Sequence, residues 1–107
     1  MKSITTIEER AHMSDGRLHH LIDEEKISHA RLFAHITLKP GQEIKMHEHH
    51  GEYEIYYILS GTGIYYDNGT EHPIMPGHVT HCKSGNAHSI KNTGEEILEY
   101  IALIVVE

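Results

Sequence analysis

Short stretches in which apolar and polar residues alternate run through the chain from residue 31 onward. Alternation with a period of two is typical of strands that bury one face. Turn residues separate several stretches, as at Pro40-Gly41, Asn68-Gly69 and Pro76-Gly77. The pattern predicts about eight strands, at residues 31–38, 42–49, 54–59, 63–66, 70–75, 79–82, 87–91 and 97–105. Short strands at this spacing favour an all-β antiparallel sandwich or barrel.

The first 30 residues carry a weaker pattern. We expect one helical turn at 8–13 and a short helix at 23–28, so helix is a minor component. Residues 18–22 predict a strand that pairs with the barrel edge or with a partner subunit. The chain therefore divides into an N-terminal segment, residues 1–30, and a barrel, residues 31–107.

Composition and charge disfavour several classes of partner and indicate a location. The 107 residues fit one domain, and 16 acidic against 9 basic residues give a formal charge of −7. This charge disfavours a nucleic-acid partner and docking on an anionic membrane. Cys82 is the only cysteine, which rules out an internal disulfide, and the first residues lack the apolar core of a secretion signal. We expect a cytoplasmic protein.

Twelve histidines are an unusual number for this length. His47 and His49 lie two residues apart in a predicted strand, so both side chains point to the same face. Glu54 opens the next strand and His88 lies in a later one. Three imidazoles and a carboxylate that converge inside a small barrel suit one divalent transition metal: Fe, Mn, Ni, Co or Zn.

The spacing of these residues resembles the two motifs of the cupin family. The first motif matches from Gly41 through His47, His49 and Glu54 to Gly61. The second matches at Gly77, Gly85, His88 and Asn92, with Lys83 in place of the usual proline. The resemblance implies a jelly-roll β-barrel of antiparallel strands with the metal inside it.

The resemblance also ranks the neighbouring residues. Glu54 fits the family spacing and Glu52 breaks it, so Glu54 is the preferred ligand. His50 points away from His49 in a regular strand. Small cupins are commonly homodimers, and the apolar run at 100–106 and the N-terminal segment are candidates for the paired surface.

Several other residues are candidates for contact with a substrate. Tyr56 shares strand parity with Glu54, so it either offers a hydroxyl to the cavity or packs as barrel interior. His81 becomes a proton-handling candidate if it points inward, which depends on the phase of the strand after Pro76-Gly77. Phe33 and His35 are candidates for the pocket lining. For Lys45 and Arg31 a position on the surface, with Arg31 in an exposed salt bridge, is favoured over an anion anchor.

Two functions are compatible with such a site, of which the first is our main hypothesis and the second the alternative. The first is a small-molecule metalloenzyme (a dioxygenase, decarboxylase or sugar isomerase) that acts on an oxygen-rich substrate through open metal positions, with Tyr56 or His81 moving protons. The second is a non-catalytic metal- and ligand-binding or sensor module, which the short chain favours. Fold alone does not choose between them.

Overall fold

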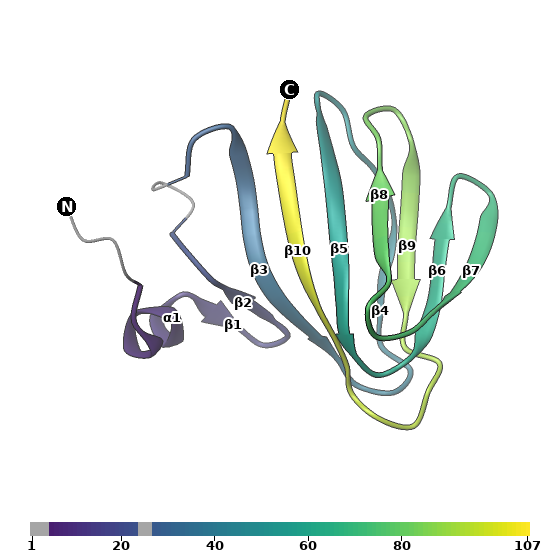
Figure 1. Cartoon of the computed structure of the whole chain (residues 1–107), viewed down its shortest axis with the longest axis horizontal. Coiled ribbons are helices and arrows are strands. Elements are labelled where there is room, and N and C mark those ends of the chain that lie inside the picture. The colour runs from purple at the N-terminus through teal and green to yellow at the C-terminus, as the bar shows by residue number, and fades with distance from the viewer. Residues whose placement is uncertain (1–4, 24–26) are drawn as a thin grey trace.

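The computed structural model describes residues 5–23 and 27–107, which form two antiparallel sheets (Figure 1). One sheet has six strands in the order β1-β2-β3-β10-β5-β8, and the other has four in the order β4-β9-β6-β7. The strands are β1 Ser14–Asp15, β2 Leu18–His20, β3 Ala30–Leu38, β4 Glu43–Glu48, β5 Glu52–Ser60, β6 Gly63–Asp67, β7 Thr70–Ile74, β8 Val79–Cys82, β9 Ala87–Lys91 and β10 Leu98–Val106. The prediction of an all-β antiparallel jelly roll with little helix is confirmed.

The N-terminal segment extends the six-stranded sheet. Its helix, α1 Ile7–His12, matches the predicted turn and begins at Thr6, whose side chain accepts from the Glu9 backbone N–H. The strand predicted at 18–22 is present as β2, which pairs with β3 so that Leu18 faces Ile36. The helix predicted at 23–28 falls mainly on residues outside the described part of the chain. None of the helices described is long and apolar enough to cross a membrane.

The core lies between the two sheets and follows the predicted alternation. In β3 the inward side chains are Ala34, Ile36 and Leu38, and in β10 they are the residues of even number from 98 to 104. The four-stranded sheet contributes Tyr65, Ile74 and Ile90 to the same cluster. Burial of this apolar surface holds the sheets face to face. The same alternation in β5 turns Glu54 inward, next to the core.

The hairpin between β6 and β7 turns at Asn68 and Gly69. Both residues have positive φ, 48° and 94°, as a two-residue hairpin turn requires. Asn68-Gly69 is therefore the turn that the sequence predicts, and it fixes the register of β6, in which Tyr65 points inward.

Candidate metal centre

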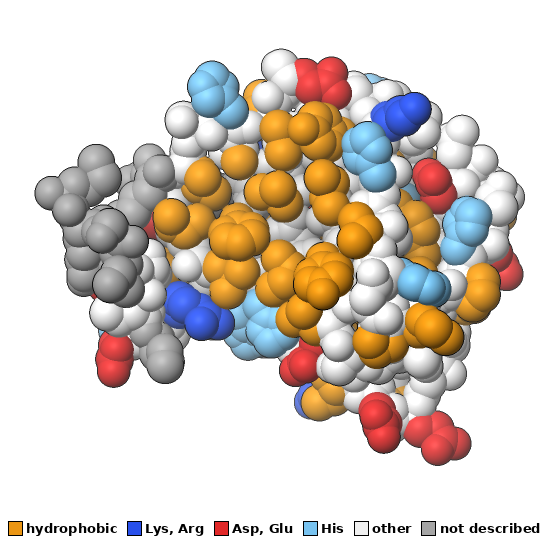
Figure 2. Space-filling model, viewed as in Figure 1, with side chains coloured by type: hydrophobic (Ala, Val, Ile, Leu, Met, Phe, Trp, Pro, Cys, Tyr) orange, Lys and Arg blue, Asp and Glu red, His pale blue; other side chains and the backbone are white. Residues whose placement is uncertain are grey.

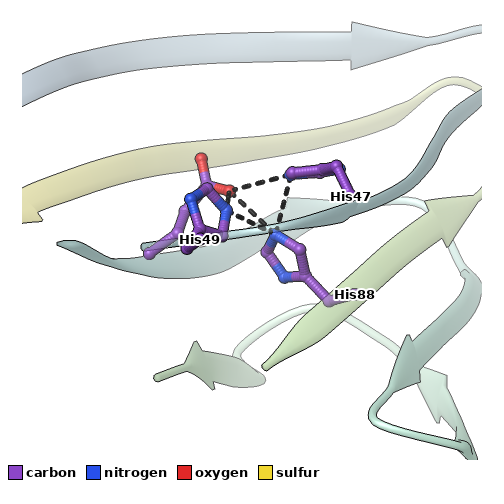
Figure 3. Close-up of side chains that lie close together, drawn as sticks. His47, His49 and His88 are labelled. Carbon is purple, nitrogen blue, oxygen red and sulfur yellow. Dashed lines mark hydrogen bonds and ion pairs between the residues drawn. The ribbon is translucent and has the colours of Figure 1, made fainter. Parts of the chain in front are cut away.

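Four side chains from both sheets converge between them. His47 lies in β4, His49 follows the end of β4, and His88 lies in β9 directly opposite His47 in the strand register. Glu54 comes from β5 in the other sheet. Figure 3 shows the three imidazole rings turned toward one another. The structure thus brings together all four residues that the sequence selects as metal ligands, with one candidate ligand atom from each within 4.8 Å of the others.

The distances between these atoms fit a transition metal. His88 Nε2 lies 3.0 Å from the Nε2 atoms of both His47 and His49, and 2.9 Å from Glu54 Oε1. His49 Nε2 lies 3.0 Å from Glu54 Oε1 as well, and the corresponding distance from His47 is 3.7 Å. Neighbouring ligands of an octahedral ion with bonds of about 2.1 Å are roughly 3.0 Å apart. The donor set therefore has the spacing of four ligands around one ion.

The outer nitrogen of each imidazole, Nδ1, has a different partner. His47 Nδ1 lies 2.7 Å from the backbone carbonyl oxygen of Lys45. His49 Nδ1 lies 2.6 Å from a carboxylate oxygen of Glu52, and His88 Nδ1 lies 2.8 Å from the hydroxyl of Tyr65. A hydrogen bond at Nδ1 therefore orients each ring so that its Nε2 is directed into the cluster.

Two of these partners also fix the proton on the ring. A carbonyl oxygen only accepts hydrogen bonds, so His47 must donate from Nδ1. The guanidinium of Arg31 holds the pKa of Glu52 at about 2, so Glu52 is an ionised acceptor and His49 must also donate from Nδ1. With the proton on Nδ1, a neutral ring at either position has the lone pair of Nε2 available to a metal, as metal ligands do.

Glu54 supplies the negative charge of the cluster. Burial raises the pKa of this carboxyl group, but hydrogen bonds with His47 and His88 outweigh burial and bring it to about 2. The same hydrogen bond with Glu54 is the main cause that raises the pKa of His47. Without a metal, protons on the ring nitrogens must bridge these contacts of about 3 Å; a divalent cation would take the place of those protons, so the donor set fits a divalent metal.

The cluster is accessible from one side. The side chain of His47 is 35% exposed, whereas those of His49, Glu54 and His88 are 5% exposed or less. A molecule from solvent therefore approaches along His47, and the other three residues form the closed wall of the site.

Tyr56 points inward, as its parity predicts, and belongs to the wall behind His88. Its ring stacks on His88 with 5.1 Å between the ring centroids and contacts Tyr100 at 4.6 Å. It is 2% exposed, and burial raises the pKa of its hydroxyl well above the usual value. The structure thus supports the reading of Tyr56 as packed interior that holds an imidazole in place.

The sequence leaves the direction of His81 open and makes its proton-handling role depend on an inward side chain; in the structure the side chain points outward. In β8 the inward residues are Thr80 and Cys82, so His81 is exposed and packs against the ring of Tyr53 on the outer face. The phase of β8 after Pro76-Gly77 could not be read from alternation, because both phases place one polar residue inward.

Other candidates also lie outside the site. Phe33 and His35 do not line the pocket, because Ala34 and Ile36 occupy the inward positions of β3. Lys45 is exposed, as the surface reading predicts. His50 points away from the cluster and pairs with Glu48 at 2.9 Å.

Sequence reasoning missed the partners of the imidazoles. Glu52 was considered only as a rival ligand, and Tyr65 was not considered at all. Tyr65 lies on β6, which neighbours β9 in the sheet, and this neighbourhood is a property of the topology rather than of any local pattern. Only the inward parity of Tyr65 within a predicted hairpin offered a signal.

The fold and the centre define a member of the cupin family. The family model described as a cupin domain matches residues 34–106, and the chain belongs to this family.

The chain is similar to several named proteins. It is 48% identical over 88 residues to a Thermotoga maritima protein named an oxalate-binding protein, covering 81% of this chain and 73% of that one. It is similar to the crystal structure of a predicted oxalate decarboxylase from Thermotoga maritima, with a TM-score of 0.82 and 46% identity over 84% of this chain and 79% of that one. Auxin-binding protein 1 of Arabidopsis thaliana is 34% identical over 77 residues, which is 64% of this chain and 38% of that protein.

Proposed function

We propose that the protein holds one divalent first-row transition metal (Fe, Mn, Ni, Co or Zn) and uses it to capture a small oxygen-rich dianion of the oxalate class. His47, His49, Glu54 and His88 would hold the metal, and the bound ion would supply a positive centre with positions left for carboxylate oxygens. The observation that supports this most directly is the spacing of the four donor atoms, 2.9–3.7 Å for the pairs described above.

The charges and the relatives support a dianion. Four protein donors leave two positions of a six-coordinate ion for a ligand, and hard carboxylate oxygens suit such positions. Only one negative side chain, Glu54, contributes to the donor set, so a divalent ion keeps a net positive charge that attracts an anion. The relative that is 48% identical is named for binding oxalate.

The surroundings of the cluster favour capture over catalysis. Tyr56 and Tyr65 are the hydroxyl-bearing side chains that contact His88, and burial raises the pKa of both. Each therefore keeps its proton near neutral pH and acts through hydrogen bonds and packing. Glu52 and Glu54, whose pKa values are about 2, have no proton to give there.

The test measures metal content and then ligand binding. Protein purified without added metal is analysed for metal, stripped with a chelator, reloaded with each candidate ion and titrated calorimetrically with oxalate, with acetate as the monocarboxylate control. We expect one metal per chain and oxalate binding that is lost on stripping. The double variant H47A/H88A should retain its fold and lose the metal; stoichiometric metal in that variant would contradict the proposal.

The same samples separate capture from the enzymatic alternative. If the protein forms formate and carbon dioxide from oxalate at a rate that depends on the metal, its function is decarboxylation rather than capture. A binding protein instead returns the oxalate intact.

We also propose a cytoplasmic location, because the single cysteine is a buried free thiol whose pKa burial raises to about 11. Such a thiol is compatible with a reducing compartment.

The outer face of the six-stranded sheet supports the homodimer that the sequence suggested. Figure 2 shows hydrophobic side chains gathered over β3, β10 and β5. The strand register sets Phe33 beside Leu103 and Ile55 in one row, and Tyr57 between Ile101 and Val79 in the next. The apolar run at 100–106 has no free strand edge to offer a partner, because β10 is bonded to strands on both sides. Its outward side chains form part of the face instead.

A second copy of the chain fits this face best. The formal charge of −7 makes most of the surface repel another copy, whereas the two rows described above are apolar apart from His35 and His81 at their ends. Three strands about 30 Å long and the shorter β8, about 14 Å long, spaced by about 4.8 Å, offer on the order of 500 Å² in projection. A stable dimer buries about 800 Å² per partner, which is of the same order.

A further inference from the structure

A chain of three side chains leads from the surface to one of the four cluster residues. Arg31 donates from Nε and a terminal nitrogen to the two oxygens of Glu52, at 2.9 and 2.8 Å. One of these oxygens, Glu52 Oε2, also accepts from His49 Nδ1 at 2.6 Å. His49 then directs Nε2 into the cluster, 3.0 Å from Glu54 Oε1.

The bridge ties three strands together at the end of the six-stranded sheet. Glu52 begins β5 and faces Val106 of β10, and Arg31 follows Ala30 of β3, which faces Val105. The pair therefore crosses the end of β10, the strand between β3 and β5. Because the paired guanidinium fixes both carboxylate oxygens, Glu52 cannot rotate without breaking two charge-assisted hydrogen bonds.

A fixed carboxylate has a specific effect on an imidazole. It requires a proton on Nδ1, so that a neutral ring offers its Nε2 lone pair to a metal, and it sets the angle at which the ring enters the cluster. His49 is 4% exposed, so water cannot take over this task.

We propose that Glu52 and Arg31 are a positioning pair that sets the tautomer and orientation of His49 and thereby the affinity of the cluster for a divalent metal. This inference rests on the metal binding proposed above. Glu52 acts through His49, and Arg31 acts through Glu52.

The chain contains a matched control a few residues away. Glu48 pairs with His50 at 2.9 Å, the same residue types at a similar distance, but both side chains are more than half exposed and His50 lies outside the cluster. A change at Glu48 removes a carboxylate–imidazole pair and one negative charge without touching a candidate ligand.

The experiment compares E52Q, R31Q and E48Q with the wild type. Affinity for Co²⁺ is measured by competition with a chelator, together with the visible absorption spectrum of the bound ion. The ring nitrogens of His49 in the metal-free protein are followed by ¹⁵N NMR. We expect E52Q to bind Co²⁺ 10–100-fold more weakly with an altered spectrum, since loss of such a partner typically has this effect. R31Q should show a smaller loss, and E48Q should match the wild type.

The metal-free NMR measurement identifies a positioning role, because a merely structural role would leave the tautomer unchanged. In the wild type Nδ1 of His49 should be protonated, and in E52Q Nδ1 should be protonated in only part of the molecules. Wild-type affinity and spectrum in both E52Q and R31Q would overturn the inference. If E52Q fails to fold, R31Q decides, because its side chain is half exposed. Failure of the wild type to bind any divalent ion would instead reject the metal proposal itself.

Discussion

The three imidazoles of the centre are held by three chemically different groups: the carbonyl of Lys45, the carboxylate of Glu52 and the hydroxyl of Tyr65. The first two only accept hydrogen bonds, whereas a phenol both donates and accepts. His47 and His49 are therefore fixed in the tautomer that a metal needs. His88 is the one ring of the three whose partner is compatible with either tautomer, so the contact with Tyr65 alone does not decide which ring nitrogen carries the proton.

The charge pair at Glu52 should appear in the acid stability of the metal-free protein. Arg31 holds the pKa of Glu52 at about 2, below its ordinary value of 4.5. The pair thus stabilises the fold above about pH 4.5, and this contribution is lost as the pH falls toward 2. We expect the free energy of unfolding in urea to depend less steeply on pH in E52Q than in the wild type over this window. The difference stays below the ~1.4 kcal/mol per pH unit of one full proton; identical slopes would contradict the prediction.

At the scale of residues, the sequence predicted the members of the cluster better than their supports. His47, His49, Glu54 and His88 follow from strand parity and motif spacing, which are local properties. Tyr65 reaches His88 only because β6 and β9 are neighbours, 23 residues apart along the chain. Contacts of that kind depend on topology, so no local pattern reveals them.

At the scale of elements, the turns determine where strands can end. Gly61 follows β5 with φ of 83°, and a Cβ there would collide with the carbonyl oxygen of Ile97 and lie 2.8 Å from Cα of Leu98. Gly77 has a similar φ of 92°, but no atom lies within 4 Å of an added Cβ. Both glycines match motif positions, and the structure assigns them different physical tasks: backbone conformation at both, and close approach to the backbone of residues 97 and 98 at Gly61 alone.

These two glycines give a matched pair of variants. G77A should lower the free energy of unfolding by ~1–2 kcal/mol, the cost of a left-handed residue with a Cβ. G61A should cost ~1–3 kcal/mol more, because the backbone of residues 97 and 98 must also move. Urea denaturation followed by far-ultraviolet circular dichroism measures both. Equal losses in the two variants would show that the close approach at Gly61 has no energetic consequence.

The strands themselves were largely predictable, since alternation and turn residues mark their limits. It was harder to predict which face of each strand turns toward the core. In β3 both faces carry apolar side chains, Phe33 on the outside and Ala34 on the inside, and alternation alone gives no preference between them. The sequence pattern therefore makes Phe33 and His35 candidates for the pocket lining, although they lie on the outer apolar face of β3.

At the scale of the whole molecule, this apolar face is the candidate dimer surface. We expect the wild type to be a dimer by size-exclusion chromatography with light scattering, and Y57E to be a monomer, because it places a charge in the middle of the face. M46E is the control: Met46 is 49% exposed and Tyr57 47%, but Met46 lies on β4 of the other sheet.

Three outcomes would contradict the dimer: a monomeric wild type, a Y57E protein of unchanged mass, or equal dissociation of M46E. Binding of the wild type to anionic vesicles that Y57E abolishes would assign the face to a membrane instead.

The position of β10 has a consequence for the folding kinetics. β10 is bonded to β3 on one side and β5 on the other, although both precede it by many residues (Figure 1). During synthesis β3 and β5 have no partner strand between them until β10 has left the ribosome, so the edges that β10 will cover stay exposed until then. Pairing over such separations raises the contact order, and sheets of this kind fold in milliseconds to seconds rather than microseconds. The nascent chain is therefore most prone to aggregation just before β10 is added.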